Sequence, residues 1–511
     1  MLDMIQDELE KRENFSVTEN GALGYKSTKS ALVDMNYKVS SFRNCDEEEI
    51  IDSFDKTYNE NREYALKWLF FARDIREGLG ERRLFRICYR RLAELDVDLF
   101  IKNLYNIAEY GRWDDLVSMI GISHKTDEYI IEIIRLQLQE DLNTLNDNES
   151  SSFIKKPISL LAKWMPSENA SSKETKKLAR KVRKLLKMSS RQYRLMLSKL
   201  RKHLNVVEVQ MCHNQWESID YEHVPSLANL KYKNAFDRHD KLRRREYLAS
   251  VKKGESKLNM GVATPVDIVS RYPKSRWRMS EPYYDEALEL AWKNLKDVLI
   301  EETLVVADGS GSMLAHVSGN ITALDVANAL AIYTSEHNSH AYKNKYITFS
   351  NKPKFVTFKN EQSLGEKLYI ATQHSEVANT NIEAVFDLIL DVSIQRKVSK
   401  DEMIKNILII SDMEFDSAQR SFWHESNVLT QPLFDEIKER YNKAGYDLPK
   451  LIFWNVNSRT KTIPLTENEL GVVLVSGFSQ NVLKMVMSSK YDPYEVLIDT
   501  ITAPRYDKIY T

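Results

Sequence analysis

Three side chains that carry oxygen ligands stand at alternate positions in one short stretch of this chain of 511 residues: Asp308, Ser310 and Ser312. Gly309 and Gly311 separate them, and glycine allows the tight turn in which alternate side chains converge. Hard divalent cations take oxygen ligands, and Mg²⁺ keeps several waters and needs few carboxylates. The stretch therefore predicts a site for Mg²⁺, with Mn²⁺ or Ca²⁺ as alternatives.

Two further polar side chains are placed to complete this site. Asp412 follows the apolar run 406–411, and Thr380 stands ahead of a helical pattern at 381–394. Because ligands bind at the carboxyl ends of the strands in an open α/β sheet, we expect Asp412 at the same edge as Asp308. Serines that only capped a helix would leave this second acidic loop unexplained. A nucleophilic serine is not indicated, because the stretch lacks the G-x-S-x-G elbow.

The elements that must position these residues are apolar strands that alternate with helices after about residue 300. The strand patterns occupy 303–308, 345–350, 406–411, 451–456 and 472–476, and the helical patterns occupy 322–337, 381–394, 432–444 and 479–488. This alternation predicts a parallel sheet covered on both faces, in a doubly wound α/β domain.

The chain before residue 300 has a different pattern, with apolar residues at helical spacing between Gly and Pro breaks. Helices are predicted at 61–76, 81–94, 98–110, 126–145, 173–187, 190–204 and 239–252. Short connections favour antiparallel helix pairs, which stack into a solenoid of the HEAT type. No fixed-period repeat is present, so a non-repetitive helical bundle is the alternative. The predicted domains are an N-terminal tail (1–20), a helical module (21–299) and an α/β domain (300–511).

The net charge of −1 hides an uneven distribution of charge along the chain. Residues 155–208 hold 16 Lys and Arg against 3 Asp and Glu, a balance of +13, whereas 301–511 hold 21 against 27, a balance of −6. Binding of a polyanion offsets the repulsion within such a basic segment, and aromatic rings among cations suit unpaired RNA bases. A solvated, lysine-rich surface is the alternative. The predicted RNA-binding residues are Lys176, Lys177, Arg180, Lys181, Arg183, Lys184, Lys187, Arg191, Tyr193, Arg194, Lys199, Arg201 and Lys202.

The stretch DGSGSM, followed by a distant Thr and a distant Asp, resembles the metal-ion-dependent adhesion site (MIDAS) of von Willebrand factor A (VWA) domains, whose pattern is DxSxS…T…D. The resemblance implies a Rossmann-like fold in which Ser310 and Ser312 ligate the metal directly. It implies that Asp308 and Asp412 act mostly through water and that Thr380 is the distant hydroxyl ligand. It also implies that an acidic side chain of a protein partner completes the metal shell. The loop SEVANTN around Thr380 departs from the pattern, because many relatives place glycines before this Thr.

The helical half carries the stretches ARDIREGLGERRLF (72–85), YGRWDDL (110–116), AKWMPS (162–167) and YRLMLSKLRKHLNVVE (193–208). Together with the later SDMEFD, they resemble a VWA-containing family of unknown function over most of residues 20–511. That family is similar to the TROVE module of the Ro and telomerase-associated vault proteins. The resemblance implies a ring of HEAT-like helix pairs, closed by the VWA domain. Such a ring binds small noncoding or misfolded RNA on its basic outer surface and single-stranded RNA ends in its central hole.

Two smaller groups of residues in the helical half are assigned to packing. The charged residues between 73 and 82 are expected to lock a helix junction through ion pairs, with a channel lining as the alternative. Trp113 and Trp164 are expected to anchor helix packing, with stacking on bases as the alternative.

We therefore expect a noncatalytic, cytoplasmic ribonucleoprotein component that binds RNA, in which the VWA domain closes the scaffold or recruits a protein at the metal site. The N-terminus lacks a signal-peptide pattern and no window approaches the length of a membrane span. One alternative is a metal-dependent adaptor that binds protein but no RNA. The other is a Mg²⁺-dependent nuclease that uses Asp308, Asp412, Glu414 and Asp416, since two-metal sites need several carboxylates.

Overall fold

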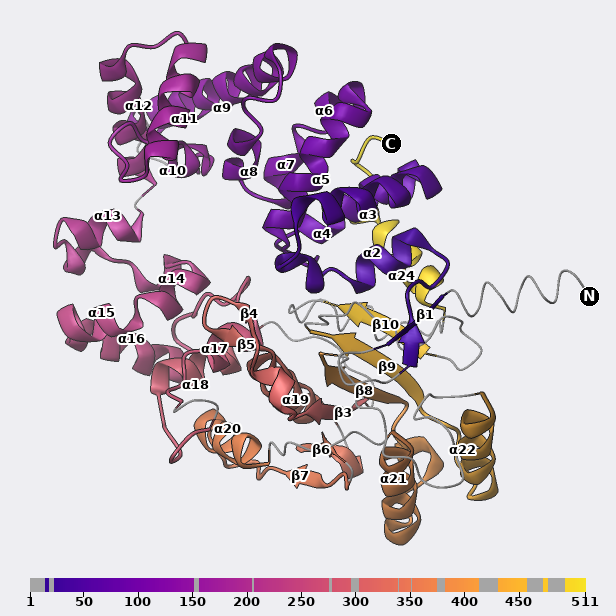
Figure 1. Cartoon of the computed structure of the whole chain (residues 1–511). Helices are drawn as coiled ribbons and strands as arrows, with labels where there is room; N and C mark the ends of the chain where they lie inside the picture. Colours follow the sequence, from indigo (N-terminus) through magenta and orange to yellow (C-terminus); the bar gives the residue numbers. More distant parts are fainter. Residues whose placement is uncertain are drawn as a thin grey trace, which may run out of the picture. The chain divides into compact units, whose positions relative to one another are not determined.

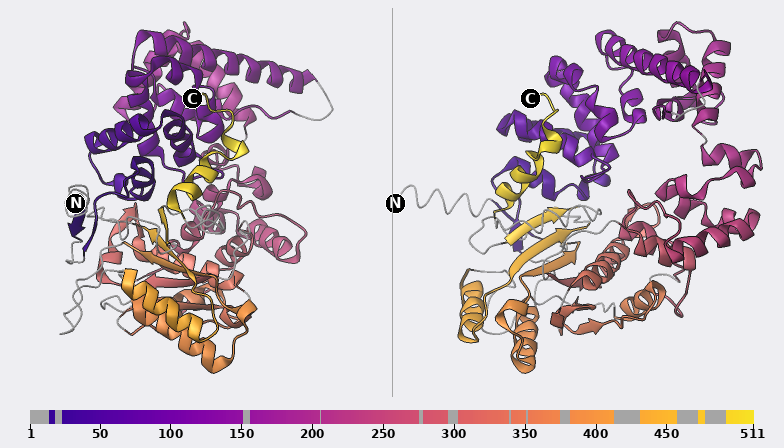
Figure 2. Two further views of the ribbon diagram at one scale, coloured as in Figure 1. Left: turned by 90° about the vertical axis from the view of Figure 1, so that its right-hand side faces the viewer. Right: turned by 180° about the vertical axis from the view of Figure 1, so that it is seen from behind.

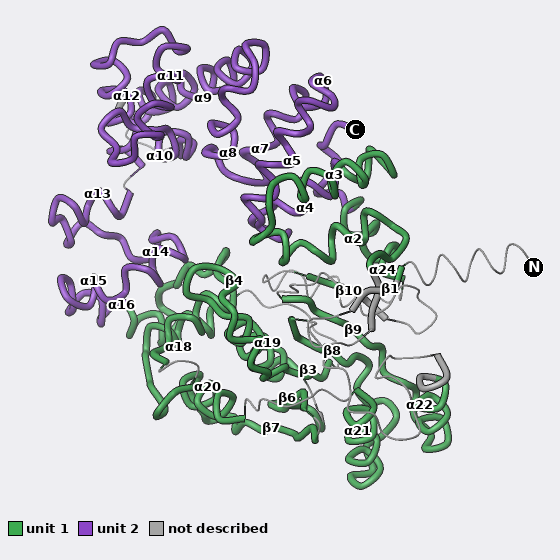
Figure 3. The backbone as a smooth tube through the Cα atoms, viewed as in Figure 1, with its two compact units in different colours: residues 1–65, 248–502 green, residues 66–247, 503–511 purple. Residues whose placement is uncertain are grey.

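The computed structural model describes residues 14–17, 23–150, 156–204, 206–274, 278–295, 303–338, 340–350, 352–374, 382–412, 431–456, 472–476 and 492–511. The chain forms two compact units, shown in Figure 3. The sheet unit comprises residues 1–65 and 248–502, and the helical unit comprises residues 66–247 and 503–511. Each unit therefore combines two segments that are distant in the sequence. The predicted domains, by contrast, are continuous ranges.

The helical unit consists of helices joined by short connections (Figure 1). Its helices are α4 (Arg62–Arg73), α5 (Arg82–Leu95), α6 (Val97–Lys102), α7 (Asn106–Tyr110), α8 (Trp113–Ser118), α9 (His124–Ser150), α10 (Leu161–Trp164), α11 (Lys173–Leu185), α12 (Ser190–His203), α13 (Val207–Cys212), α14 (Ser226–Lys231), α15 (Lys233–His239) and α16 (Lys241–Lys253), of which α4 and α16 extend past the bounds of the unit. Each predicted helical stretch before residue 300 contains helix, but 98–110 is divided into α6 and α7. No helix among the described residues has the length and apolarity that a membrane span requires.

The break between α6 and α7 is stabilised by the C-terminal segment of the chain. The Asn103 side-chain amide donates to the Tyr510 carbonyl at 2.9 Å and its oxygen accepts from the Tyr510 backbone N–H at 3.0 Å. Asn106 donates to the Lys508 carbonyl at 3.0 Å. These bonds tie the residues at the break to the C-terminal segment. Because their partners lie about 400 positions away, helical periodicity alone did not predict the break.

The sheet unit contains a six-stranded sheet in the order β10-β9-β8-β3-β6-β7. Its strands are β3 (Thr303–Asp308), β6 (Lys345–Phe349), β7 (Phe355–Thr357), β8 (Asn406–Ser411), β9 (Lys450–Asn455) and β10 (Val472–Ser476). All neighbours are parallel except β7, which runs antiparallel to β6. The five predicted strands are parallel to one another, as expected. The antiparallel edge strand β7 was not predicted, and the short connection after β6 permits only a hairpin return there.

Helices cover both faces of this sheet, which explains why its strands are apolar throughout. On one face, α21 (Ile382–Arg396) and α22 (Gln431–Lys443) pack over Val306 and Ile409, and they lie side by side in Figures 1 and 2. On the other face, α19 (Ala323–His337) packs against β3 and is buried from Ala323 to Ser335. The predicted helix at 479–488 lies outside the described residues.

The remaining elements of the sheet unit come from both sides of the helical unit in the sequence. They are the hairpin β1 (Phe15–Val17) and β2 (Leu23–Tyr25), the helices α2 (Ala31–Tyr37), α3 (Glu47–Glu60), α17 (Pro265–Val269), α18 (Glu286–Lys293), α20 (Leu364–Gln373) and α24 (Pro493–Ile501), and the hairpin β4 (His316–Ser318) and β5 (Ile321–Thr322). The end of α2 is attached to the sheet, because the Asn455 amide donates to the Tyr37 carbonyl at 3.1 Å. The N-terminal helix is thus part of this unit.

Candidate metal site and candidate nucleic-acid interface

The register of two neighbouring strands brings the predicted metal-site residues to one edge of the sheet. In the parallel pair β3 and β8, Ala307 lies opposite Ile410, so Asp308 and Ser411 leave the sheet together. The Ser411 hydroxyl donates to Asp308 Oδ2 at 2.6 Å. Asp412 follows directly and is 1% exposed, while Asp308 is 3% exposed. The strand register therefore places Asp412 at the same edge of the sheet as Asp308.

The loop after β3 turns back onto the Asp308 carboxylate. The Ser310 backbone N–H donates to Asp308 Oδ1 at 2.8 Å, and the hydroxyl oxygens of Ser310 and Ser312 lie 2.9 Å apart. Each oxygen of Asp308 thus accepts at least one hydrogen bond. These bonds hold the carboxylate in a fixed orientation at the edge of the sheet.

These oxygen donors fit a hard divalent cation better than a soft one. The chain leaves β3 for β6 on one side and later adds β8 on the other, so strand order reverses at β3, where open α/β sheets bind ligands. Among the described residues, no three side chains of His, Cys, Asp or Glu gather as a metal cluster. Thr380, Glu414 and Asp416 lie outside the described residues, so the predicted third ligand loop and the alternative acidic cluster stay predictions.

The predicted RNA-binding residues lie on α11 and α12 and the connection between them, and tertiary contacts divide them into two groups. The buried side of α11 carries Ala179, Val182 and Leu186, at helical spacing. Most of the cations point away from that side into solvent. Those classed as exposed are Lys177, Arg180, Lys181, Lys184, Lys187, Arg191, Arg194, Lys199 and Lys202.

Three of the predicted residues are committed to the fold. Arg201 donates to the Ala162 and Met165 carbonyls and to the Ser167 hydroxyl, at 2.7–2.8 Å. Arg183 pairs with a glutamate of the preceding loop at 2.8 Å. Tyr193 has no exposed surface.

The predicted stacking role of Tyr193 is therefore wrong. Its ring lies in the core of the helix pair, and its hydroxyl donates to the Pro166 carbonyl at 2.8 Å. Burial raises the pKa of this hydroxyl above its ordinary value. Burial also lowers the pKa of Arg201, as expected for a cation taken out of water.

The other cations differ in whether a neighbour already holds them. Lys181 pairs with Asp127 of α9 at 2.8 Å, and Lys199 donates to Asn146 at 3.1 Å. Within the part of the chain that the structure describes, seven predicted cations have neither a hydrogen bond from the side chain nor an ion pair. We call these the open cations: Lys176, Lys177, Arg180, Lys184, Lys187, Arg191 and Lys202.

The junction between α4 and α5 is locked through ion pairs, but the partners lie elsewhere in the chain than predicted. Arg73 is buried and pairs with Asp115 of α8 at 2.7 Å, and Arg86 bonds the other oxygen of Asp115 at 2.7 Å. Asp74 accepts from Arg505 of the C-terminal segment at 2.8 Å. The two adjacent acids of YGRWDDL were the sequence feature that could have indicated the partner of Arg73 and Arg86.

Comparison with known proteins identifies the helical half of this chain. The model of a family described as a domain of unknown function (DUF2828) matches residues 18–135 and 129–304. The uncharacterized protein L728 of Acanthamoeba polyphaga mimivirus is 31% identical over 523 residues, which cover 96% of this chain and 87% of that protein. The chain belongs to the DUF2828 family.

Two further comparisons concern the sheet and the whole fold of this DUF2828 protein. A second domain of unknown function (DUF7788) matches residues 302–500. The crystal structure of the Ro (RSR) protein of Deinococcus radiodurans has a TM-score of 0.37 and 14% identity, over 81% of this chain and 92% of that chain. A similarity at this level leaves function to be argued from the residues themselves.

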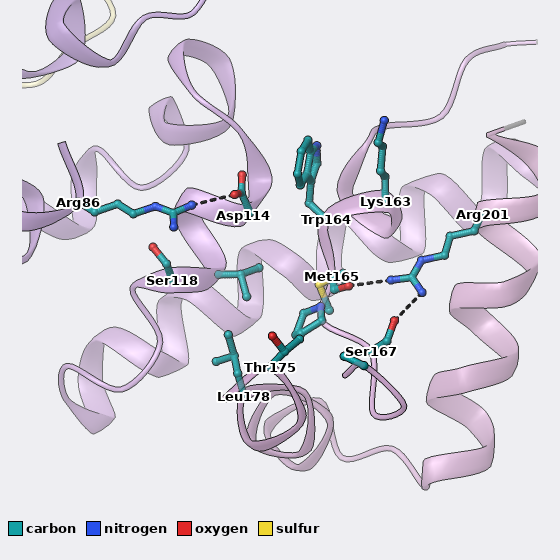
Figure 4. Close-up of a pocket in the computed structure, with 13 residues that line it drawn as sticks. Arg86, Asp114, Ser118, Lys163, Trp164, Met165, Ser167, Thr175, Leu178 and Arg201 are labelled. Carbon is teal, nitrogen blue, oxygen red and sulfur yellow. Dashed lines mark hydrogen bonds and ion pairs between the residues drawn. The ribbon is translucent and has the colours of Figure 1, made fainter. Parts of the chain in front are cut away.

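A pocket in the helical unit of the DUF2828 protein brings together residues that the sequence did not connect (Figure 4). It has a volume of about 510 Å³ and is lined by parts of α5, α8, α10, α11 and α12. Trp164, which was expected to anchor packing, is only half-buried and forms part of the lining. The Arg112 guanidinium lies 5.0 Å from the centre of its ring. The stretch AKWMPS, which contributes several lining residues, was the sequence feature that could have indicated this pocket.

Proposed function

We propose that this protein binds RNA through the open cations of α11 and α12 and does not cleave it. The observation that carries the proposal is that these cations are not neutralised by carboxylates within the described residues. A surface helix ordinarily mixes charges of both signs, and uncompensated like charges repel one another. Phosphates offset that repulsion and release counterions, which gives salt-dependent affinity. Several stretches resemble a VWA-containing family that is similar to the TROVE module, and this resemblance supports the same function.

Charge reversal of four residues tests this proposal. The variant Lys177→Glu, Arg180→Glu, Lys184→Glu and Lys187→Glu should lose at least about 100-fold in affinity for a 12-nucleotide single-stranded RNA in 50 mM salt. A matched control reverses four exposed lysines of the sheet unit: Lys352, Lys359, Lys397 and Lys438. The control is matched in backbone as well, since Lys187 and Lys397 both have positive φ. Equal affinities of the two variants would contradict the proposal.

A second candidate function is metal-dependent recruitment of a protein at the sheet edge. Support comes from the strand order, with its reversal at β3, and from the meeting of Asp308, Ser310 and Ser411 there. We propose that the sheet unit is a VWA-like domain and that Ser310 and Ser312 hold a divalent cation. The bound cation would supply an electrophilic position for an acidic side chain of a partner. Asp308 and Asp412 would fix metal-bound waters by accepting their hydrogen bonds.

The two functions and the nuclease alternative are separated by one set of measurements. RNA affinity should be the same in 5 mM Mg²⁺ and in EDTA, and it should fall with rising salt. The length of a labelled single-stranded RNA should be unchanged after incubation with protein and Mg²⁺. Shortening of the RNA that requires Mg²⁺ and disappears in Asp308→Asn would favour the nuclease instead.

A further inference from the structure

The pocket in the helical unit is distinct from the open cations. Of the predicted RNA-binding residues, Arg201 alone belongs to its lining. The α11 residues that line it are Thr175 and Leu178, one on either side of the half-buried Lys176 and the exposed Lys177. Its volume of about 510 Å³ lies in the range of small-molecule sites.

The lining contains three cations, of which two are already used by the protein. Arg86 bonds Asp114 at 2.8 Å and also bonds Asp115. Arg201 is held by carbonyls and a hydroxyl of the loop after α10. Within the described ranges, the ammonium group of Lys163 has neither a hydrogen bond nor an ion pair. Figure 4 shows Lys163 beside Trp164, while dashed lines connect Arg86 and Arg201 to their partners.

Two cations lie close to the indole ring of Trp164. Arg112 lies 5.0 Å and Lys163 5.7 Å from the centre of the indole ring, distances at which cations are attracted to the ring face. Burial, followed by the nearby Arg82 and Arg73, lowers the pKa of Arg112. Lys163 therefore places a cation without an acidic partner among the described residues beside an aromatic ring of the pocket.

The rest of the lining combines apolar side chains with hydroxyl groups and the Asp114 carboxylate, which pairs with Arg86. Val117 and Leu178 form part of the apolar wall, and Ser118 and Thr175 add hydroxyls. Inorganic phosphate alone would leave most of this volume unfilled. A purely apolar ligand would bury the Lys163 ammonium without a partner, which is costly. A ligand with a flat ring, a polar middle and one anionic group satisfies all three parts.

We propose that this pocket binds a single nucleotide, with its phosphate at Lys163 and its base against the apolar wall. The nucleotide is either a free nucleoside monophosphate or one unit of an RNA strand, and only the second source rests on the proposed function. In that case the open cations supply sequence-independent affinity, and the pocket holds one base that has left the stack.

Calorimetric titrations with AMP, adenosine and a 12-nucleotide oligouridylate test the proposal. AMP should bind more tightly than adenosine. Lys163→Gln should weaken AMP binding about tenfold, the typical value of one charge-assisted hydrogen bond, and should leave adenosine binding unchanged. Lys102→Gln is the matched control, because it removes one exposed lysine of the same unit outside the pocket lining. Both variants should fold, since neither ammonium has a hydrogen bond to lose.

The results distinguish failure of the pocket from failure of RNA binding. If wild type binds the oligouridylate but not AMP, and Lys163→Gln binds it as wild type does, the pocket proposal is overturned and RNA binding stands. If AMP binds in a Lys163-dependent way and the oligouridylate does not bind, the pocket proposal stands with the free nucleotide as its ligand. Equal losses in Lys163→Gln and Lys102→Gln would overturn it, because bulk charge would then account for the effect.

Discussion

Burial has opposite meanings in the two candidate sites of this protein. At the sheet edge, two residues predicted to act at the metal, Asp308 and Asp412, are almost fully enclosed, and the predicted direct ligands Ser310 and Ser312 are half-buried. On α11 and α12, the buried Tyr193 and the half-buried Arg201 support the helix pair, and the exposed cations are available to a ligand. A polar side chain therefore has to be assigned from its partners, and neither its type nor its exposure suffices.

The difference follows from the kind of ligand that each site suits. A single small cation is held by convergent oxygens, which have to be enclosed and oriented by their own hydrogen bonds. A polyanion is bound by many separate charges on a surface, and each one remains exposed. Enclosed residues at such a surface are thus part of its framework.

The largest expected effect is the loss of stability when a residue that supports the basic surface is removed. Arg201→Ala removes three hydrogen bonds that fix the loop after α10, so the free energy of unfolding should fall by about 3 kcal/mol. The neighbouring Lys202→Ala should change it by less than about 0.5 kcal/mol, because Lys202 is exposed and is one of the open cations. Urea denaturation measures both. Equal losses of stability would remove the distinction between framework and surface cations.

The next prediction concerns the enclosed oxygens of the sheet edge. Mg²⁺ at 100 times its dissociation constant should raise the free energy of unfolding of the sheet unit by about 2.7 kcal/mol. Asp412→Asn keeps the shape of the side chain but removes its charge, so this stabilisation should be lost. Asp401→Asn is the control, since Asp401 is an exposed acid of the same unit. Thermal unfolding with and without Mg²⁺ measures the effect, and equal stabilisation of both variants would exclude a cation at Asp412.

The sequence was informative wherever structure depends on neighbouring residues or on strand register. The runs 303–308, 406–411 and 472–476 match β3, β8 and β10 to the residue. The loop residues that follow β3 and β8 were therefore correctly placed at one edge of the sheet. Helix α11 was also expected at almost the observed bounds, because Gly and Pro breaks and apolar periodicity are local signals.

What the sequence could not provide depends on contacts between distant segments. The residues next to Tyr193 in the sequence are the same whether its ring is exposed or buried. Its burial is shown by a contact with a distant segment, the hydrogen bond to the Pro166 carbonyl. The attachment of Arg505 to Asp74 involves residues 431 positions apart. No helical or strand period carries information about such pairs, so the division of the chain ends between the two units was not predictable from patterns.

A smaller effect tests the correction at Tyr193. Tyr193→Phe removes the hydrogen bond to Pro166 and should lower the free energy of unfolding by about 1 kcal/mol at pH 7. RNA affinity should not change, because the ring is enclosed.

Burial raises the pKa of the Tyr193 hydroxyl in the folded state. Its stabilising contribution is therefore present below the ordinary tyrosine pKa of about 10 and is lost as pH rises above it. The two proteins should then converge in stability, as urea titrations at pH 7 and above 10 would show. Weaker RNA binding by Tyr193→Phe at pH 7 would restore a direct role for this residue.

The smallest effect compares two lysines on the same helix. Lys184 is one of the open cations, whereas Lys181 is paired with Asp127. A cation that neutralises one phosphate of a single strand adds about 0.7 to the slope of log affinity against log salt. Lys184→Ala should reduce the slope by about that amount. Lys181→Ala should reduce the slope by less, because Asp127 already balances the charge of Lys181 in the unbound protein. The substitution then leaves Asp127 without this ion pair. Fluorescence anisotropy at four salt concentrations measures both slopes. Equal reductions would mean that Lys181 leaves Asp127 when RNA binds. An ion pair in the unbound protein would then not indicate which cations of this helix are unavailable to RNA.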